Sequence, residues 1–469
     1  MWNFRRFKNY VALVDENEEV LYKDLDYYSK IIGKKLIKNT LTVILTDNSI
    51  DAIICYVSLL KKRFPILILD HKISQKYLKN IIRLYKPKNI CLPHNNLSFK
   101  VDKFFKFNFH FRKMTFLKDT SKNSIKFKNN ISILASTSGS TGSAKLIRQS
   151  FNNIKFNTFS ILKYLKLTKN YTTITNLPLS YTFGMSVINT HLEVGSKIVV
   201  TKSTIFEKKF WKLFNFFKVN TFYGVPYTFE ILDKLKFFSR NKSSLKLFAQ
   251  GGGKLTENLQ KKISFYVKKY KKLFFIMYGQ AEATTRISYL PSKKFGKKIG
   301  SIGIPVPGGK ISLINENNKI IKGTNTVGEI MYEGKNVCMG YAFDRQDINK
   351  KNQWNYKVLT GDLAKKDKDG YYYIVGRKKR FSKIYGLNIN LDDIENLLKS
   401  KFKNVEIAVI SINNKIRIFT SKNNLNEKIL NYIKKNVNIN FNSFEVVYIQ
   451  KMPYLNNGKH DYKVLLNYR

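Results

Sequence analysis

Residues 137–145 read Thr137-Ser138-Gly139-Ser140-Thr141-Gly142-Ser143-Ala144-Lys145, a run of hydroxyl residues and glycines that ends in a lysine. The run follows the apolar residues 131–134, which are typical of a strand, so we expect a loop between two ordered elements. Glycines let backbone N–H groups approach an anion, hydroxyls add donors, and lysine adds a positive charge. The run is therefore either a loop that holds polyphosphate or an ordinary surface turn. It lacks the Gly-Lys-Ser/Thr ending of a P-loop.

On both sides of this loop, short apolar runs alternate with amphipathic segments. The predicted strands are residues 43–45, 66–69, 198–200, 222–226 and 273–277, and the predicted helices are residues 50–61, 75–84 and a segment capped by Thr256. Strands that alternate with helices favour a parallel sheet in a layered α/β domain. In such sheets ligands bind at the carboxyl ends of the strands, which draws attention to the residues that follow 273–277.

Four other segments are predicted to have a different character. Residues 100–130 are polar, lysine-rich and interspersed with phenylalanine, which we interpret as a connection. Residues 176–184 carry a proline and a glycine among aromatic residues, as in a loop against a pocket. The glycines and prolines after Gly300 indicate a β-rich subdomain. From about Lys379 onwards a small domain is predicted, with a hairpin over residues 407–420.

The charge of the chain is strongly positive. Its 469 residues hold 84 Lys+Arg against 32 Asp+Glu, a formal net charge of +52. Such a balance can indicate a protein that binds nucleic acid or anionic membranes. However, the basic residues are mostly lysines, spread evenly along the chain, which favours a codon bias acting on exposed positions. A content of 43% hydrophobic and 14% aromatic residues excludes wholesale disorder.

The cysteines and the apolar segments indicate in which cellular compartment the protein is expected. Cys55, Cys91 and Cys338 are scattered, with no CxxC pair and no histidine at ligand spacing. A structural disulfide or zinc site is therefore not expected, and a reducing cytoplasm is predicted. The N-terminus has no apolar leader segment, and no stretch of about 18 apolar residues occurs, so we predict neither secretion nor a transmembrane helix.

Five motifs occur after this loop in a fixed order. They are Gly251-Gly252-Gly253, Tyr278-Gly279-Gln280-Ala281-Glu282, Thr360-Gly361-Asp362, Gly376-Arg377 and Gly458-Lys459. Together with the loop over residues 137–145, they resemble the AMP-forming adenylating superfamily of acyl-CoA synthetases, amino-acid adenylation domains and luciferases. The resemblance implies a large domain over residues 1–378, made of layered α/β subdomains and a small β-rich subdomain. It also implies a mobile α+β C-terminal domain over residues 379–469, with a hinge near Lys379.

The resemblance implies a role for each motif. The loop that includes Thr141 and Lys145 resembles the one that grips the β- and γ-phosphates of ATP. The glycines of 251–253 and the Tyr278-Gly279-Gln280 segment resemble the residues that enclose adenine. Glu282 matches the acid that holds Mg²⁺, Asp362 the ribose ligand, and Arg377 a cation near ribose and phosphate. Lys459 matches the lysine that bridges the attacking carboxylate and the α-phosphate, which is electrostatic catalysis.

Some positions depart from the family pattern. Ala281 replaces a threonine whose hydroxyl is expected near the α-phosphate, a loss for which Thr284 or Thr285 could compensate. The other departures are Ala144 in place of proline, Lys379 in place of aspartate, Asn388 in place of arginine and Tyr462 in place of arginine. None of these removes the Mg²⁺, ribose or lysine chemistry, so activity is still expected.

The implied reaction turns a carboxylic acid and ATP into an acyl-adenylate and pyrophosphate, and then forms a thioester. In the second step the small domain rotates about Lys379 and brings the Gly386 loop to the pantetheine thiol. The acyl pocket is assigned to Tyr181, Phe183 and Gly184. No acid stands there to hold an α-ammonium group, which favours a plain acyl or aryl acid over an amino acid.

The acceptor and the competing hypotheses stay open at this level. No carrier segment follows Arg469, so the expected acceptor is CoA or a separate acyl-carrier protein. One alternative is an amino-acid adenylating, carrier-loading ligase. Others are a basic protein that binds nucleic acid or anionic surfaces without catalysis, and a degenerate adenylating fold kept as a binding module.

Overall fold

The computed structural model describes residues 1–96, 104–121, 127, 131–136, 145–239, 241, 243–384, 387–412, 415–437, 440–455 and 460–468. They form two compact units. Unit 1 holds the described residues within 1–136, 145–311 and 331–358, and unit 2 holds those within 312–330 and 359–468. In this described part of the chain, no helix combines the length and the apolar character needed to cross a bilayer.

A nine-stranded sheet forms one half of unit 1. Its parallel centre consists of β14 (Leu273–Tyr278), β13 (Leu247–Gln250), β12 (Thr221–Gly224), β10 (Thr172–Ile174), β11 (Lys197–Val199) and β1 (Val11–Val14), in that order. Antiparallel strands complete it, namely β15 (Ser288–Leu290) and β16 (Ile304–Pro305) beyond β14 and β2 (Glu19–Leu21) beyond β1. Its central strands are buried, which explains their unbroken apolar runs.

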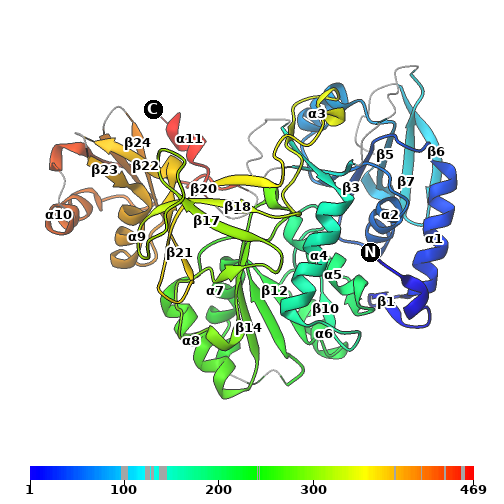
Figure 1. The fold of residues 1–469 in the computed structure, drawn as a ribbon, viewed down its shortest axis with the longest axis horizontal. Helices are drawn as coiled ribbons and strands as arrows, with labels where there is room; N and C mark the ends of the chain where they lie inside the picture. Colours follow the sequence, from blue (N-terminus) through cyan, green and yellow to red (C-terminus); the bar gives the residue numbers. More distant parts are fainter. Residues whose placement is uncertain are drawn as a thin grey trace. The chain divides into compact units, whose positions relative to one another are not determined.

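Helices connect the strands of this sheet. They are α4 (Phe151–Leu165), α5 (Thr182–Glu193), α6 (Lys208–Phe216), α7 (Pro226–Lys234) and α8 (Glu257–Lys269). Figure 1 shows α4 and α5 side by side next to β10, and α7 and α8 beside β12 and β14. Helix α8 follows Thr256 as predicted, and it buries Leu259, Ile263 and Val267 while its lysines 261, 262, 268 and 269 are exposed.

An eight-stranded sheet forms the other half of unit 1. Its order is β19 (Tyr341–Ala342), β9 (Leu146–Ser150), β8 (Ile131–Ser136), β4 (Ile66–Asp70), β3 (Thr42–Thr46), β5 (Asn89–Pro93), β7 (Met114–Asp119) and β6 (Phe105–Phe111). Its helices are α1 (Tyr22–Lys35), α2 (Ile50–Lys61) and α3 (Gln75–Tyr85). Nearly every residue of α2 is buried, and one apolar core joins α2 to strands of both sheets.

Two predictions about local structure are wrong. Residues 100–130 are not a plain connection, because they contain the β6–β7 hairpin. Phenylalanines at alternate positions 105, 107, 109 and 111 suit a pleated strand, and a bulge between 107 and 109 leaves Phe107 exposed while Phe109 is buried. Residues 182–184 are not loop either, because α5 begins at Thr182.

Unit 2 is built from small sheets. A four-stranded sheet runs β17 (Lys310–Ile314), β18 (Gly328–Glu333), β20 (Lys357–Lys366) and β21 (Tyr372–Arg377), and some of these strands begin or end in unit 1. A hairpin joins β22 (Phe381–Ile384) to β23 (Leu387–Asn390), and a three-stranded sheet holds β24 (Ile407–Ile412), β25 (Lys415–Thr420) and β26 (Phe444–Tyr448). The β24–β25 hairpin was expected, and its turn residues 413 and 414 lie outside the described residues.

The helices of unit 2 are α9 (Leu391–Lys401), α10 (Asn426–Asn436) and α11 (Tyr462–Leu466). Short 3-10 helices complete the described chain: η1 (Phe4–Phe7), η2 (His94–Asn96), η3 (Phe237–Ser239), η4 (Ala281–Ala283), η5 (Ser292–Lys294), η6 (Asp347–Asn349), η7 (Lys378–Arg380) and η8 (Phe441–Ser443). The layered α/β architecture and the β-rich part after Gly300 are confirmed, while the hinge at Lys379 stays a prediction.

Candidate functional site

The carboxyl ends of four parallel strands of the nine-stranded sheet lie along one edge. The loops that leave this edge begin at Thr175 after β10, Val225 after β12, Gly251 after β13 and Gly279 after β14. Ligands of open α/β sheets bind at this edge. Two predicted motifs, Gly251–Gly253 and the segment from Tyr278, therefore leave neighbouring strands at the same end of the sheet.

The glycine loop after β13 packs directly against the predicted acyl pocket. A Cβ atom at Gly251 would lie 3.0 Å from Cε1 of Phe183, and one at Gly252 would lie 2.8 Å from the Tyr181 hydroxyl. Gly252 also has a φ of +85°, which disfavours a side chain. The structure thus brings the predicted nucleotide glycines and the predicted acyl-pocket aromatics into contact.

Gly184 has its own packing reason to be a glycine. A Cβ atom there would lie 2.3 Å from the carbonyl oxygen of Pro178. The first turn of α5 can approach the preceding loop only because this side chain is absent. Gly184, which was assigned to the acyl pocket, therefore lies in the first turn of α5, where the helix packs closely against the preceding loop.

The turn after β14 folds back sharply on itself. A Cβ atom at Gly279 would lie 1.8 Å from the carbonyl oxygen of Thr285, so only glycine fits. The backbone N–H of Thr285 donates to the Gln280 carbonyl at 3.1 Å. Thr284 and Thr285 have positive φ values of +49° and +96°, which are strained for β-branched residues. Strain of this kind costs about 1–3 kcal/mol per residue and collects at functional sites.

A buried asparagine holds the strained turn in place. The Nδ2 amide of Asn336 donates to the carbonyl oxygens of Ala283 at 2.8 Å and Arg286 at 2.7 Å. The hydroxyl of Tyr332 donates to Oδ1 of Asn336 at 2.8 Å, and Asn336 is fully buried. These bonds offset the backbone strain. Sequence reasoning missed Asn336, which lies about fifty residues beyond the turn and in no motif.

Ala281, which stands in place of the family's threonine, lies in the same turn. Its carbonyl oxygen accepts hydrogen bonds from Nε2 of Gln149 at 3.3 Å and from the Cys338 thiol at 3.2 Å. The hydroxyls of Thr284 and Thr285 both donate to backbone carbonyls, of Asn336 and Thr284 respectively. Neither threonine therefore offers its hydroxyl proton to a phosphate in place of the missing hydroxyl at 281.

Tyr341 connects two of the predicted site residues. Its hydroxyl donates to Oε1 of Glu282 at 2.9 Å, and Nζ of Lys145 lies 3.4 Å from the centre of its ring. Burial raises the pKa of Tyr341, and the Glu282 carboxylate raises it further, so the phenol stays protonated and acts as a donor. A cation and a carboxylate thus share one aromatic side chain, which no motif predicted.

The residues around Glu282 fit a magnesium ion that phosphates help to hold. Among the described residues, no group of three or more His, Cys, Asp or Glu side chains gathers into a protein-only metal cage. Magnesium in nucleotide sites usually takes one or two carboxylates and completes its shell with phosphate and water. The half-buried Glu282 can supply that one hard oxygen ligand.

Unit 2 contains the predicted ribose carboxylate and its neighbouring cation. Asp362 and Arg377 lie directly opposite each other in the β20–β21 ladder, and Nε of Arg377 lies 2.9 Å from Oδ1 of Asp362. The Asp362 side chain is 5% exposed, whereas that of Arg377 is 60% exposed. Most of the Arg377 side chain is therefore open to solvent, while the carboxylate that it contacts is buried. The two residues form a neighbouring pair, and the ribose and phosphate roles given to them stay predictions.

Several residues that were predicted for the site are not among those that the structure describes. Residues 137–144, Gly386 and Lys459 are outside the described residues, and Lys379 is described only as part of η7. Lys145 is therefore the only residue of the first loop for which the structure describes a position.

The residues that follow Lys459 are fixed by a charged cluster in unit 2. The Tyr462 hydroxyl donates to both carboxylate oxygens of Glu395, at 3.0 and 2.9 Å. Nζ of Lys399 lies 2.6 Å from Glu395 and 3.3 Å from Nε2 of His460. The guanidinium of Arg380 also contacts Glu395 and lies 4.1 Å from the Tyr462 ring. Tyr462, which replaces the arginine of the family pattern, therefore anchors the start of α11 to α9.

A comparison with protein-family models agrees with this site. The model of the AMP-binding enzyme family matches residues 2–342, which is most of the chain. The chain belongs to the AMP-binding enzyme family. The resemblance to adenylating enzymes inferred from the motifs is thereby confirmed.

Relatives of this AMP-binding enzyme include two CoA ligases. Over 281 residues it is 30% identical to 2-succinylbenzoate–CoA ligase of Oceanobacillus iheyensis, a match that covers 60% of this chain and 56% of that protein. It is 27% identical to probable 4-coumarate–CoA ligase 1 of Dictyostelium discoideum, covering 61% of this chain and 52% of that protein. The chain thus spans about half the length of these relatives.

Solved structures share the fold over the whole chain. The o-succinylbenzoate CoA synthetase of Bacillus subtilis, in complex with an acyl-adenylate intermediate, superposes with a TM-score of 0.80 at 19% identity, covering 100% of this chain and 99% of that one. ATP-bound MatB of Rhodopseudomonas palustris gives a TM-score of 0.76 at 17% identity, with coverage of 98% and 95%. The predicted fold class is therefore confirmed.

Proposed function

We propose that this AMP-binding enzyme activates a carboxylic acid with ATP and then transfers the acyl group to a thiol. A carboxylate oxygen attacks the α-phosphorus of ATP, the bond to the bridging oxygen of the β-phosphate breaks, and pyrophosphate leaves. The acyl-adenylate then reacts with the thiol of CoA, or with the pantetheine of a separate carrier protein, and AMP leaves. The contacts of Lys145 and Glu282 with Tyr341 support this proposal, because they bring together a cation that we assign to the phosphates and a carboxylate that we assign to Mg²⁺.

The nucleotide is assigned to the turns at the ends of β13 and β14. Gly251–Gly253 and Gly279 admit an adenine ring because they lack side chains, and Tyr278 supplies an aromatic face. Glu282 would hold Mg²⁺, which neutralises charge on the phosphates. In unit 2, we assign Asp362 to the ribose hydroxyls and Arg377 to the ribose and phosphate.

Lys459 is assigned the central catalytic role. Its ammonium group would stabilise the negative charge that collects on the carboxylate and the α-phosphate during displacement. The described residues after it, from His460 onwards, are anchored to α9 through Lys399 and Glu395. For the thioester step we propose a rotation about Lys379 that presents the loop containing Gly386 to the thiol.

The acid is assigned to the pocket of Tyr181, Phe183 and Gly184. Two relatives carry 2-succinylbenzoate and 4-coumarate in their names, together with CoA, so an acid with an aromatic or acyl body and CoA as acceptor are favoured. We also propose a reducing, cytoplasmic setting, because Cys55, Cys91 and Cys338 are all buried free thiols.

The test is pyrophosphate release measured across fatty, aromatic, hydroxy and amino acids, with and without CoA. Lys459→Ala should lower acid-dependent release by at least about 100-fold, because an electrostatic contact to the transition state is lost. ATP binding, followed by thermal shift, should change little. Lys451→Ala removes an exposed lysine nearby in sequence and is the matched control.

Unchanged pyrophosphate release in Lys459→Ala would refute the assignment. If no acid supports release or ATP–pyrophosphate exchange, the fold serves as a binding module. If, in addition, the protein binds duplex DNA or anionic vesicles tightly and with a steep salt dependence, its net charge of +52 reflects its function.

A further inference from the structure

Arg286 places a positive charge in the interior of unit 1. The residue is 4% exposed and ends the strained turn that starts at Gly279. Its guanidinium lies 4.1 Å from the centre of the Phe183 ring, and Nη2 donates to Oγ of Ser186 at 3.2 Å. Nε donates to the Met277 sulfur at 3.4 Å and Nη1 to the Thr285 carbonyl at 3.3 Å. All of these contacts are to neutral groups.

No negative charge in the described residues compensates Arg286. None of the ion pairs of the described chain includes it. Burial lowers the pKa of Arg286, and only the phenols of Tyr164, Tyr181 and Tyr223 act against this. A buried charge without a partner is costly, so proteins pair such charges with an opposite charge.

A second buried arginine shows what a purely structural role looks like. Arg148 is fully buried, and its guanidinium donates to the carbonyl oxygens of Lys350 and Met339 and to Oε1 of Gln353. These oxygens explain Arg148 as a clamp on the segment around residues 339–353. Arg286 instead has one backbone carbonyl, the Ser186 hydroxyl, the Tyr164 phenol and one thioether, none of which is charged.

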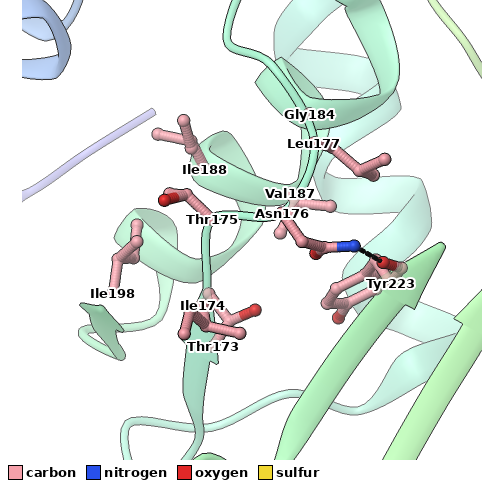
Figure 2. A pocket seen from close by; sticks show the side chains of 10 residues that line it. All are labelled: Thr173, Ile174, Thr175, Asn176, Leu177, Gly184, Val187, Ile188, Ile198 and Tyr223. Atoms are coloured by element: carbon pink, nitrogen blue, oxygen red, sulfur yellow. Dashed lines mark hydrogen bonds between the residues drawn. The ribbon is translucent and has the colours of Figure 1, made fainter. Parts of the chain in front are cut away.

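Arg286 lies at the proposed acid pocket. Its guanidinium lies over the ring of Phe183. That ring packs against Gly251, where an added Cβ atom would lie 3.0 Å from Cε1 of Phe183. Tyr223, which influences Arg286 electrostatically, lines a small cavity together with Gly184 and Val187 of α5 (Figure 2). Ser186 lines a second small cavity. Each cavity has room for about one water molecule, about 10 Å³.

Tyr223 adds a second observation that points to a ligand. Its hydroxyl is buried and has no hydrogen-bond partner in the described part of the structure. Its ring packs edge-on against Phe183, with 6.3 Å between ring centres. An unsatisfied donor and an uncompensated cation therefore flank the same phenylalanine.

We propose that Arg286 binds a second carboxylate of the acid that the enzyme activates, so that the substrate is a dicarboxylic acid. This proposal rests on the proposed function. The planar guanidinium matches a carboxylate in a bidentate geometry, and the Tyr223 hydroxyl supplies a further donor. One carboxylate of the substrate is adenylated, and the other stays ionised against Arg286.

The first experiment compares matched acids in the pyrophosphate-release assay. Each dicarboxylic acid, one aliphatic and one aromatic, is tested beside its monoamide and beside the monocarboxylic acid of the same skeleton. We expect kcat/KM for the dicarboxylic acid to exceed that for the monoamide by about 100-fold or more, because a buried charge rejects a neutral group. Arg286→Met should lower kcat/KM for the dicarboxylic acid far more than for the monocarboxylic acid, so that most of this preference is lost.

The second experiment measures binding without turnover. The dicarboxylic acid should raise the Tm of the wild-type protein and leave that of Arg286→Met unchanged. Without ligand, Arg286→Met should not lower the Tm, because it replaces an uncompensated charge by an apolar side chain of similar length. Arg148→Met is the matched control and should lower the Tm clearly, since it leaves buried carbonyls without donors.

The possible outcomes distinguish a failure of the dicarboxylate inference from a failure of the proposed function. Equal use of mono- and dicarboxylic acids in both proteins would overturn the dicarboxylate inference and leave the proposed function intact. A fall in Tm for Arg286→Met as large as for Arg148→Met would also overturn it, since Arg286 would then be structural. If no acid supports pyrophosphate release, the proposed function fails, and an Arg286-dependent Tm shift with the dicarboxylic acid would still establish the binding site.

Discussion

Tyr341 shows how much of a phosphate site depends on one hydroxyl outside every motif. The phenol orients one oxygen of Glu282, and the face of its ring receives the ammonium of Lys145. The ring therefore keeps the cation and the carboxylate close while its hydroxyl occupies one carboxylate oxygen. If Lys145 and Glu282 bind phosphate and Mg²⁺ as proposed, Tyr341 orients both groups without itself being assigned to the nucleotide.

Tyr341→Phe should weaken the response to magnesium. Removal of the hydroxyl leaves the Glu282 carboxylate without its donor, and partners of this kind are worth about 10- to 100-fold in metal affinity or activity. We expect the Mg²⁺ concentration for half-maximal pyrophosphate release to rise about 10-fold. The exposed Tyr356 offers the control Tyr356→Phe. An unchanged magnesium response in Tyr341→Phe would mean that Glu282 is oriented by other groups.

For single residues, the sequence predicts a functional role only where several polar and charged side chains stand together in a short motif. Glu282 and Lys145 could be predicted because each ends a motif. Asn336 and Tyr341 could not, because they reach the turn across more than fifty residues and local patterns do not encode such contacts. Arg286 stands directly before the segment Ile287-Ser288-Tyr289-Leu290, and nothing in this local pattern indicates that its charged side chain is buried.

Among elements, the turn between β14 and β15 controls the site. Its path depends on the close approach of Gly279 to the Thr285 carbonyl and on the bonds from Asn336. These contacts are to backbone atoms, so they fix the path of the main chain through the turn. A change in its path would move Glu282 and Arg286 together.

Gly279→Ala should abolish acid-dependent pyrophosphate release. The new Cβ would lie 1.8 Å from the Thr285 carbonyl, so the turn must open and Glu282 must shift. We expect a loss of at least about 100-fold, since misplaced groups of about 1 Å already have this effect. Gly33→Ala, in the last turn of α1 beside the flexible Lys62 side chain, should leave activity unchanged. Retained activity in Gly279→Ala would show that the turn is not needed in this form.

The elements that sequence reasoning missed have physical explanations. The β6–β7 hairpin contains several lysines, and its bulge leaves Phe107 exposed and Phe109 buried, so the alternating phenylalanines do not mark one buried face. The start of α5 is hidden by a preceding proline and by Gly184, which look like breakers but serve a close approach to the Pro178 carbonyl. In contrast, helix α2 was predicted at its observed bounds because its apolar run has no competing explanation.

For the molecule as a whole, the buried His191 and the half-buried His460 make stability depend on pH. Burial lowers the pKa of His191 in unit 1 and of His460 in unit 2, each from 6.5 to about 4. His191 is fully buried, and its ring nitrogens lie 2.8 Å from the Val187 carbonyl and 3.1 Å from Oγ1 of Thr221. In this pH range the unfolded chain binds protons that the folded protein excludes.

Stability should therefore fall as the pH decreases from about 6.5 to 4. The contribution of His191 amounts to about 3 kcal/mol in the free energy of unfolding, fully present above pH 6.5 and lost towards pH 4. Urea denaturation at a series of pH values measures it. His191→Gln should flatten the slope in this window, and the exposed substitution Asn315→Gln should not. An equal slope in His191→Gln and the wild type would contradict the prediction.

The architecture as a whole was the part most accessible from sequence. Alternating apolar and amphipathic segments are repeated many times, so errors at single elements such as β6 and β7 do not change the α/β class. The interpretation of the positive charge as exposed lysine is consistent with α8, whose apolar face is buried and whose lysines lie outside it. How the units act together is a property that local periodicity does not encode.

The way in which the β14–β15 turn is held has an evolutionary consequence. Gln149 and Cys338 bind the carbonyl of Ala281, and Asn336 binds those of Ala283 and Arg286, so each support recognises the main chain. The side chains at positions 281, 283 and 286 can therefore change by mutation while these hydrogen bonds, and with them the path of the turn, are kept. If Arg286 binds the acid as proposed, a change at position 286 would alter the choice of acid and leave the hydrogen bonds that hold the turn in place.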